Sequence, residues 1–163
     1  MFPLDILEAA EELLERYRAA GRQLVTAESC TGGLIAGALT EIAGSSDVVE
    51  RGFVTYSNAS KSELLGVAES TLAEFGAVSG ETARAMAEGA LAASHAQIAL
   101  SVTGVAGPGG GSPEKPVGLV WFGLAKQDEP AFAQSDRQLF SGTRSEVRLA
   151  SLRHGIHLLA HAL

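Results

Sequence analysis

Apolar residues follow two different periods along the chain, and the change of period separates predicted helices from predicted strands. Between residues 4 and 20, Leu7, Leu14 and Tyr17 lie on one helical stripe, whereas residues 23–26 form a short apolar run with β-branched character. The pattern predicts helices over residues 4–20, 31–43, 58–66, 70–75, 80–94 and 143–163, and strands over residues 23–26, 48–56, 97–102, 117–125 and 131–140.

The order of these elements predicts the fold class. The first three strands alternate with helices, which favours a parallel sheet, and the last two follow one another across a polar turn, residues 126–130, as in a hairpin. We therefore expect an α/β protein, a three-layer α/β/α sandwich with a mixed, mostly parallel sheet of about five strands. No internal repeat and no linker is visible, so residues 1–163 are expected to form one domain.

Composition and charge exclude several classes of partner. Hydrophobic residues make up 46% of the 163 residues, which is enough for a substantial core. The net charge is −7, and because proteins that bind nucleic acid usually present a basic face, nucleic acid is not an expected partner. No apolar run approaches the roughly 20 residues of a membrane span, and the N-terminus lacks a signal-peptide pattern. We therefore expect a cytoplasmic protein without a membrane partner.

A polar cluster at residues 26–33, Thr-Ala-Glu-Ser-Cys-Thr-Gly-Gly, separates the first predicted strand from the next helix. In an open α/β sheet, ligands bind beyond the carboxyl ends of the strands, where helix N-termini present unpaired N–H groups. Ser29 lies at this junction, so a nucleophile and an oxyanion site could share it. The alternative is that the serine and threonines only cap the helix, and that Gly32 and Gly33 only allow close packing.

Cys30 is the one cysteine of the sequence, which excludes an intrachain disulfide and a zinc site built on several thiolates. A catalytic cysteine needs a histidine base nearby, and the four histidines are all predicted on helical segments away from the turns. Cys30 is therefore expected to be a small buried residue. Three of the histidines share one face of the last helix, where an exposed or subunit-interface face is favoured over a metal site.

A second polar cluster follows the strand at residues 48–56 and contains Tyr56, Asn58 and Lys61. If Asn58 caps a short helix, Lys61 lies in its first turn. A positive charge there opposes the helix dipole, and the same field favours the neutral amine. A solvated surface lysine is the alternative interpretation.

The loop at residues 103–116 is the one segment of the sequence that is dense in glycine and proline. Such a backbone can approach a ligand closely or move as a lid, and the alternative is a flexible connector. The loop matches neither the P-loop pattern nor the dinucleotide-binding pattern.

The last helix begins with a predicted capping box, formed by Thr143 and Glu146. Arg144 and Arg148 occupy its first turns, where positive charge opposes the dipole. A bound anion would relieve this conflict, so we expect a phosphate or carboxylate near Arg144. A salt bridge to Glu146, or solvation, is the alternative.

Together these segments resemble the C-terminal domain family of the competence-damage-inducible protein CinA. The resemblance runs nearly end to end and rests on five segments that agree in order and spacing: residues 27–33, Tyr56-Ser57-Asn58 followed by Lys61, Gly76-Ala77-Val78-Ser79, residues 103–110, and Gly142-Thr143-Arg144. Many members of that family are nicotinamide mononucleotide amidases. They hydrolyse the carboxamide to nicotinate mononucleotide and ammonia in pyridine-nucleotide recycling, and the resemblance implies that activity here.

The resemblance also implies roles for particular residues. Ser29 would be the nucleophile, Lys61 the general base, and Tyr56 would complete their hydrogen-bond network, with no metal or other cofactor. Implied substrate-binding residues are Cys30, Thr31, Gly32, Gly33, Asn58, Thr103, Gly104, Gly107 and Arg144. The implied partners are a small-molecule nucleotide and further copies of the chain, in a homodimer or larger assembly. The alternative function is a non-catalytic nucleotide-binding or regulatory module of the same fold.

Overall fold

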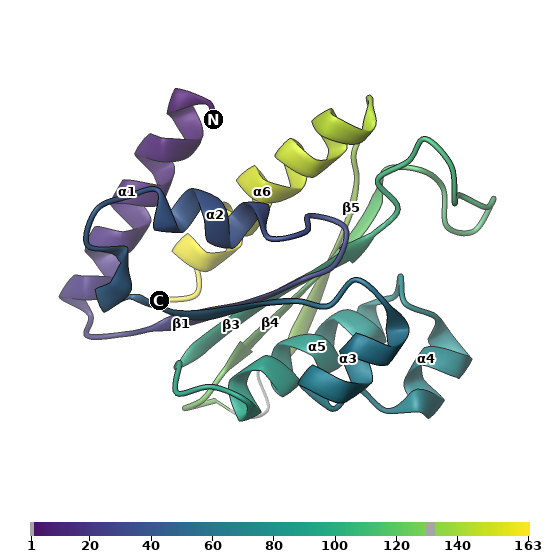
Figure 1. The fold of residues 1–163 in the computed structure, drawn as a ribbon, viewed down its shortest axis with the longest axis horizontal. Helices are drawn as coiled ribbons and strands as arrows, with labels where there is room; N and C mark the ends of the chain where they lie inside the picture. The colour runs from purple at the N-terminus through teal and green to yellow at the C-terminus, as the bar shows by residue number, and fades with distance from the viewer. Residues whose placement is uncertain (1, 130–132) are drawn as a thin grey trace.

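In the computed structural model, which describes residues 2–129 and 133–163, a five-stranded sheet lies between two layers of helices (Figure 1). The described strands are β1 Leu24–Glu28, β2 Val49–Val54, β3 Ile98–Gly104, β4 Leu119–Lys126 and β5 Gln134–Leu139. The described helices are α1 Leu4–Ala19, α2 Leu34–Thr40, α3 Asn58–Leu65, α4 Glu69–Phe75, α5 Gly80–Ala92 and α6 Arg144–Ala160, with a short 3₁₀ helix at Ser45–Asp47. The predicted three-layer α/β class is confirmed.

The strand order β2-β1-β3-β4-β5 brings the ends of three parallel strands to one edge of the sheet. β1 pairs in parallel with β2 and β3, whereas β4 pairs antiparallel with both β3 and β5. Among the described strands only β4 therefore runs against the others, as expected of a mixed, mostly parallel sheet. Glu28 at the end of β1 lies beside Val54 of β2 and Val102 of β3. The segments that leave these three strands meet at this edge.

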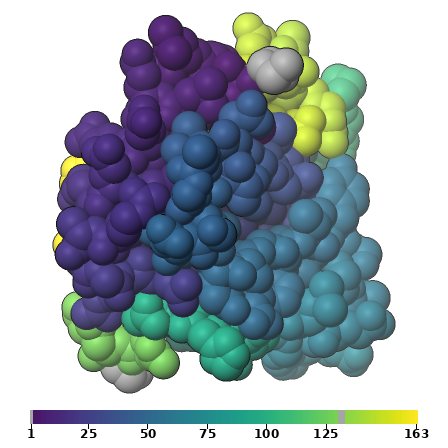
Figure 2. Space-filling model, turned by 60° about the vertical axis from the view of Figure 1, so that its left-hand side comes forward, coloured from purple at the N-terminus to yellow at the C-terminus, as the bar shows by residue number. Residues whose placement is uncertain are grey.

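Two hydrophobic clusters hold the helices against the two faces of the sheet. α1, α2 and α6 cover one face, where Tyr17, Ile35 and Leu152 belong to one buried cluster (Figure 1). α3, α4 and α5 lie on the other face, where Leu65 and Met86 belong to the second cluster. The interior strand β1 is covered on both faces and is buried throughout its length. The space-filling view shows the N-terminal half of the chain forming most of one side of the molecule (Figure 2).

Two helices begin differently from the sequence-based expectation. The helix expected from residue 31 begins at Leu34, because Gly32 and Gly33 have φ angles of +61° and +93°, outside the helical region. The expectation that Asn58 caps α3 is wrong. The N-cap is Ser57, which forms a capping box with Ser60.

Further sequence-based expectations concern the histidines and the last hairpin. The expectation that all four histidines lie on helices is wrong for His95, which follows α5 in a bend, and for His161, the C-cap of α6. The capping box expected at Thr143 and Glu146 is confirmed. The expected hairpin turn and the start of its second strand include residues 130–132, which lie outside the described residues. Over residues 2–129 and 133–163, no helix combines the length and the apolar character needed to cross a membrane.

The close packing of α3 against α5 can be tested by a substitution. A Cβ at Gly89 of α5 would overlap the backbone carbonyl of Leu65 at the end of α3. Alanine usually stabilises a helix interior by about 1 kcal/mol over glycine, but here the clash with backbone should win. We expect Gly89→Ala to lower the free energy of unfolding by about 1–3 kcal/mol, measured by urea denaturation.

Gly37→Ala in α2 is the matched control, because its Cβ would meet only the Phe2 ring, at 3.4 Å. This control should leave the stability unchanged or raise it. Equal stabilisation by both substitutions would show that α3 does not rest on α5 at Gly89.

Candidate functional site

Ser29 and Lys61 meet at the edge where the parallel strands end. Ser29 directly follows β1, and Lys61 reaches it from α3, which follows β2. The Lys61 Nζ lies 3.1 Å from the Ser29 Oγ and donates to the backbone carbonyl of Thr55 at 2.9 Å. Lys61 is 1% exposed and Ser29 is 8% exposed. The structure therefore brings together the two residues for which the sequence analysis expects a shared role, and the surface-lysine alternative for Lys61 is excluded.

The surroundings of Lys61 favour a neutral amine. Burial lowers the pKa of Lys61 from the ordinary lysine value, because removal from water disfavours the ammonium form. In the described part of the chain, both hydrogen-bond partners of its Nζ are uncharged groups, a hydroxyl and a carbonyl. A neutral amine has a lone pair, so it can accept the proton of the Ser29 hydroxyl. This pair can therefore generate a nucleophilic serine.

The position of Ser29 is fixed by its backbone and by the two glycines that follow it in the turn. Its N–H donates to the Val102 carbonyl at 2.9 Å, which extends the pairing of β1 with β3 by one residue. Its carbonyl accepts from the N–H of Gly32 at 3.0 Å. The left-handed φ angles of Gly32 and Gly33 then turn the chain into α2. The serine is thereby held at the tip of the strand.

Glu28 caps α2 from inside the fold. This carboxylate is 1% exposed and accepts hydrogen bonds from the N–H groups of Gly33 and Ile35 at 3.1 Å and of Ala36 at 2.9 Å. A carboxylate at a helix N-terminus satisfies the unpaired donors and interacts favourably with the helix dipole. The first N–H groups of α2 are therefore occupied by the protein's own carboxylate, and they are not free for a bound anion.

Cys30 is buried, as expected. It is 6% exposed, and burial raises the pKa of its thiol to about 12. A thiol that stays protonated at neutral pH is a poor nucleophile. The hydroxyl of Ser29, with its lysine neighbour, is the better candidate.

Arg144 connects Tyr56 to the glycine-rich loop. Its Nη2 donates to the Tyr56 hydroxyl at 3.0 Å, and its Nη1 donates to the Gly107 carbonyl at 2.9 Å. Tyr56 is 63% exposed, and its described hydrogen bond leads to Arg144 instead of to the Ser29–Lys61 pair. The three residues form a second cluster, in which Arg144 is exposed and keeps donor capacity for a ligand.

The remaining expected substrate-binding residues lie in different surroundings. Thr103 is 1% exposed and donates its hydroxyl hydrogen to the Ala77 carbonyl at 2.7 Å, so it fixes the segment before α5. Gly104 ends β3, and a side chain there would clash with Leu119 and Val120 of β4. Asn58 is exposed and lines a surface hollow between α3 and α4. These three residues are not joined to Ser29 or Lys61 by a described hydrogen bond.

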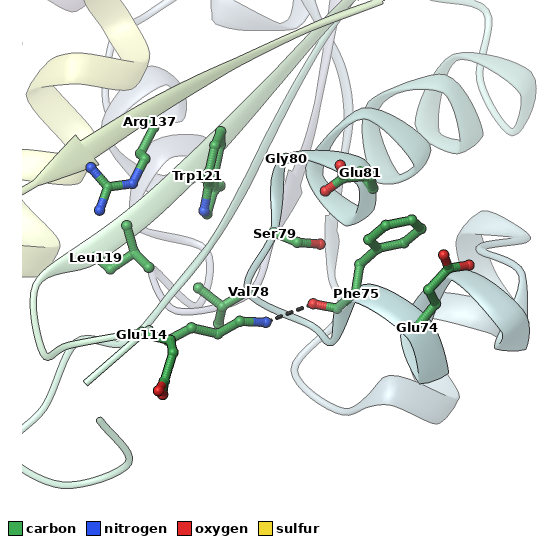
Figure 3. Close-up of a pocket in the computed structure, with 11 residues that line it drawn as sticks. Glu74, Phe75, Val78, Ser79, Gly80, Glu81, Glu114, Leu119, Trp121 and Arg137 are labelled. Carbon is green, nitrogen blue, oxygen red and sulfur yellow. Dashed lines mark hydrogen bonds between the residues drawn. The ribbon is translucent and has the colours of Figure 1, made fainter. Parts of the chain in front are cut away.

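A separate cavity of about 390 Å³ lies between the N-terminus of α5, α4 and β4. Figure 3 shows Trp121, Phe75 and Arg137 in its walls. The Lys115 Nζ donates to the Phe75 carbonyl at 2.6 Å. The cavity lining contains none of the site residues expected from the sequence. In the described residues, no group of three or more histidine, cysteine, aspartate or glutamate side chains could hold a metal ion.

Two charged residues of the site, Glu28 and Arg148, have roles that the sequence analysis does not assign. Arg148 of α6 donates from Nε to the Cys30 carbonyl at 3.2 Å and from Nη2 to the Thr31 carbonyl at 2.9 Å. A carboxylate at the end of an otherwise apolar strand was the available signal for Glu28. For Arg148 the signal was its spacing of four residues from Arg144, which places both on one side of α6.

A protein-family model and several known proteins match this chain over most of its length. The family model of the CinA C-terminal domain matches residues 7–163. The nicotinamide-nucleotide amidohydrolase PncC of Enterobacter agglomerans is 56% identical over 87% of this chain and 85% of that protein. The protein of the same name from Escherichia coli K12 is 46% identical over 95% and 93% of the two chains.

Solved structures support the same relationship. The competence/damage inducible protein CihA from Agrobacterium tumefaciens has a TM-score of 0.92 at 50% identity, over 99% of this chain and 98% of that chain. A CinA superfamily protein from Escherichia coli has a TM-score of 0.91 at 30% identity, over 100% and 94% of the two chains.

The carboxylate cap of α2 can be tested by an isosteric change. In Glu28→Gln, one of the two oxygen positions becomes an NH₂ group, which faces N–H donors and cannot accept from them. We expect the free energy of unfolding to fall by about 1–3 kcal/mol in urea denaturation, the usual cost of a buried unpaired donor. Glu41→Gln, at the exposed C-terminal end of α2, is the control and should change stability little. Equal effects of the two substitutions would contradict the capping role.

Proposed function

Because the chain belongs to the CinA C-terminal domain family, we propose that it hydrolyses the carboxamide of nicotinamide mononucleotide, giving nicotinate mononucleotide and ammonia. One observation carries the proposal, namely the buried Lys61 amine 3.1 Å from the Ser29 hydroxyl. The names of the two amidohydrolase relatives, which match nearly the whole chain, support the choice of substrate.

In the proposed first step, the neutral Lys61 amine takes the hydroxyl proton as Ser29 Oγ attacks the carboxamide carbon. The oxyanion that forms is stabilised by a backbone N–H of the turn after Ser29 that is not bonded to another residue in the described part of the chain. The lysine then returns the proton to the amide nitrogen, the C–N bond breaks, and ammonia leaves. This leaves an ester on Ser29. Water, deprotonated by the same amine, cleaves the ester and restores the serine.

The proposed binding residues fall on the surfaces around this pair. Arg144 is the best candidate for the phosphate, because its guanidinium is exposed and can bind a phosphate through two parallel hydrogen bonds. Tyr56 and Gly107 already contact Arg144 and would help to form this subsite. Asn58, Thr103 and Gly104 stay predictions as substrate residues, as does assembly into a homodimer or larger oligomer.

A non-catalytic nucleotide-binding module is the competing function. Ammonia release from nicotinamide mononucleotide by the purified, EDTA-treated protein separates the two, with free nicotinamide and nicotinamide adenine dinucleotide as comparison substrates. Turnover of the mononucleotide supports the amidase. Binding of the mononucleotide without ammonia release would support the module.

Substitutions in the Ser29–Lys61 pair should not be additive. Ser29→Ala, Lys61→Ala and the double variant should each lose a similar factor in kcat, on the order of 10³ or more, since neither group works without the other. Lys61→Arg should fail as well, because a guanidinium stays protonated and cannot accept the serine proton. Near-normal turnover by Lys61→Arg would instead make Lys61 an electrostatic anchor.

The pH dependence of kcat/KM should report the ionisation of Lys61. The pKa of this amine is lowered, and its neutral form is the active one. Activity should therefore rise with pH through a midpoint below the ordinary lysine value of about 10.4 and fall on acidification. The rising limb should be missing from the residual activity of Lys61→Ala. A limb unchanged in that variant would assign it to another group.

Arg144 should act on binding more than on the chemical step. We expect Arg144→Ala to raise KM by about 10-fold or more while kcat changes less, because a phosphate contact remote from the carboxamide stabilises the ground and transition states about equally. Steady-state kinetics with nicotinamide mononucleotide measures both constants. An unchanged KM would remove Arg144 from the phosphate site.

A further inference from the structure

Most backbone N–H groups in the turn after β1 are bonded within the protein. Those of Ser29, Gly32 and Gly33 all have partners. Over the described part of the chain, the N–H groups of Cys30 and Thr31 have no hydrogen bond to another residue. Unpaired N–H groups in buried segments are uncommon and have a reason where they occur.

Exposure separates these two donors. Ser29 and Cys30 are 8% and 6% exposed, whereas Thr31 is 0% exposed. The full burial of Thr31 leaves the N–H of Cys30, the residue next to the nucleophile, as the candidate donor to a substrate carbonyl at the Ser29 hydroxyl.

Arg148 holds the part of the turn that follows this donor. Its Nε donates to the Cys30 carbonyl at 3.2 Å and its Nη2 to the Thr31 carbonyl at 2.9 Å, so one rigid guanidinium spans two consecutive peptide groups. Because peptide groups are planar, fixing their carbonyls fixes the orientation of these peptide units. The preceding Ser29–Cys30 peptide is fixed by the bond from Gly32 to the Ser29 carbonyl. The Thr31 carbonyl also accepts from the N–H of Leu34 at 3.3 Å, whereas Arg148 is the one described partner of the Cys30 carbonyl. Loss of Arg148 would therefore free the Cys30–Thr31 peptide, which is joined at the Cys30 Cα to the peptide that carries the Cys30 N–H.

We propose that Arg148 is a positioning residue for amide hydrolysis, which keeps the N–H of Cys30 aimed at the oxyanion that forms next to Ser29. The inference rests on the proposed function for its chemistry. Arg144, one turn earlier on α6, faces the Tyr56 hydroxyl and the loop, whereas both described bonds of Arg148 go to the nucleophile turn. In this proposal Arg144 binds the substrate, and Arg148 keeps the turn after β1 in the geometry that the transition state requires.

The test compares Arg148→Met and Arg148→Lys with Arg153→Met. Arg153 lies on the same helix and forms an exposed ion pair with Asp5, so it is a matched control. Lysine keeps the charge but has one nitrogen, which cannot reproduce the two-pronged contact. With nicotinamide mononucleotide, we expect both Arg148 variants to lose about 10-fold or more in kcat, with KM within about 3-fold of the wild type. Wild-type kcat in either variant would overturn the proposal.

Two further readouts separate positioning from other roles. In a Ser29→Ala background, Arg148→Met should leave the dissociation constant for the mononucleotide unchanged, since only transition-state contacts are lost, and a large increase would show a binding role instead. The midpoint of the rising limb of kcat/KM against pH should also stay in place. A rate loss that disappears at higher pH would show that Arg148 acts on the ionisation of Lys61 and would overturn positioning.

Amide hydrogen exchange tests the contact without using turnover. Exchange in the peptide covering residues 29–36 should be faster in Arg148→Met and in Arg148→Lys than in the wild type, and unchanged in Arg153→Met. Unchanged exchange in both Arg148 variants would overturn the proposal even if the wild type hydrolysed no substrate. An inactive wild type with the expected exchange pattern would refute the proposed function while leaving the hold on the turn established.

Discussion

A lysine amine enclosed beside a serine hydroxyl is the constraint on which the site depends. An ammonium group removed from water needs a counter-charge or must lose its proton, and Lys61 is bonded to a hydroxyl and a carbonyl. The enclosure requires that β1 and β2 end side by side, so that Ser29 and the Thr55 carbonyl face the same amine. It also requires that α3 lie close against α5, which the bare backbone of Gly89 allows. The chemistry of the amine is therefore a property of the fold.

The two charges nearest the nucleophile turn are both directed at backbone. Glu28 binds the N–H groups at the start of α2, and Arg148 binds the carbonyls of Cys30 and Thr31. Each charge satisfies groups that the turn would otherwise leave unpaired. Glu28 accepts from three backbone donors, and over residues 2–129 and 133–163 it forms no ion pair with the Lys61 amine.

Sequence patterns predicted the features that depend on residues close together in the sequence. Hydrophobic period and βα alternation predicted the sheet and its layers. The family resemblance, and not the polar residues alone, implied that Ser29 and Lys61 share a site. The N-cap of α3 could not be predicted, because Ser57 and Asn58 are both favourable N-cap residues. The capping box with Ser60 makes Ser57 the N-cap. The contacts of Arg148 with residues 117 and 118 positions away could not be predicted, because only the packing of α6 against the turn brings them together.

Side chains hold the glycine-rich loop at both ends. One end is held by the bond from Arg144 to the Gly107 carbonyl and the other by the bond from Lys115 to the Phe75 carbonyl. If Arg144 binds the substrate phosphate, as proposed, the charged ligand competes with a neutral carbonyl for the same donors. A phosphate carries a full negative charge, so it gains Coulomb attraction to the guanidinium that a neutral carbonyl lacks. Because the same guanidinium contacts Gly107, the position of this end of the loop would be linked to whether the phosphate subsite is filled.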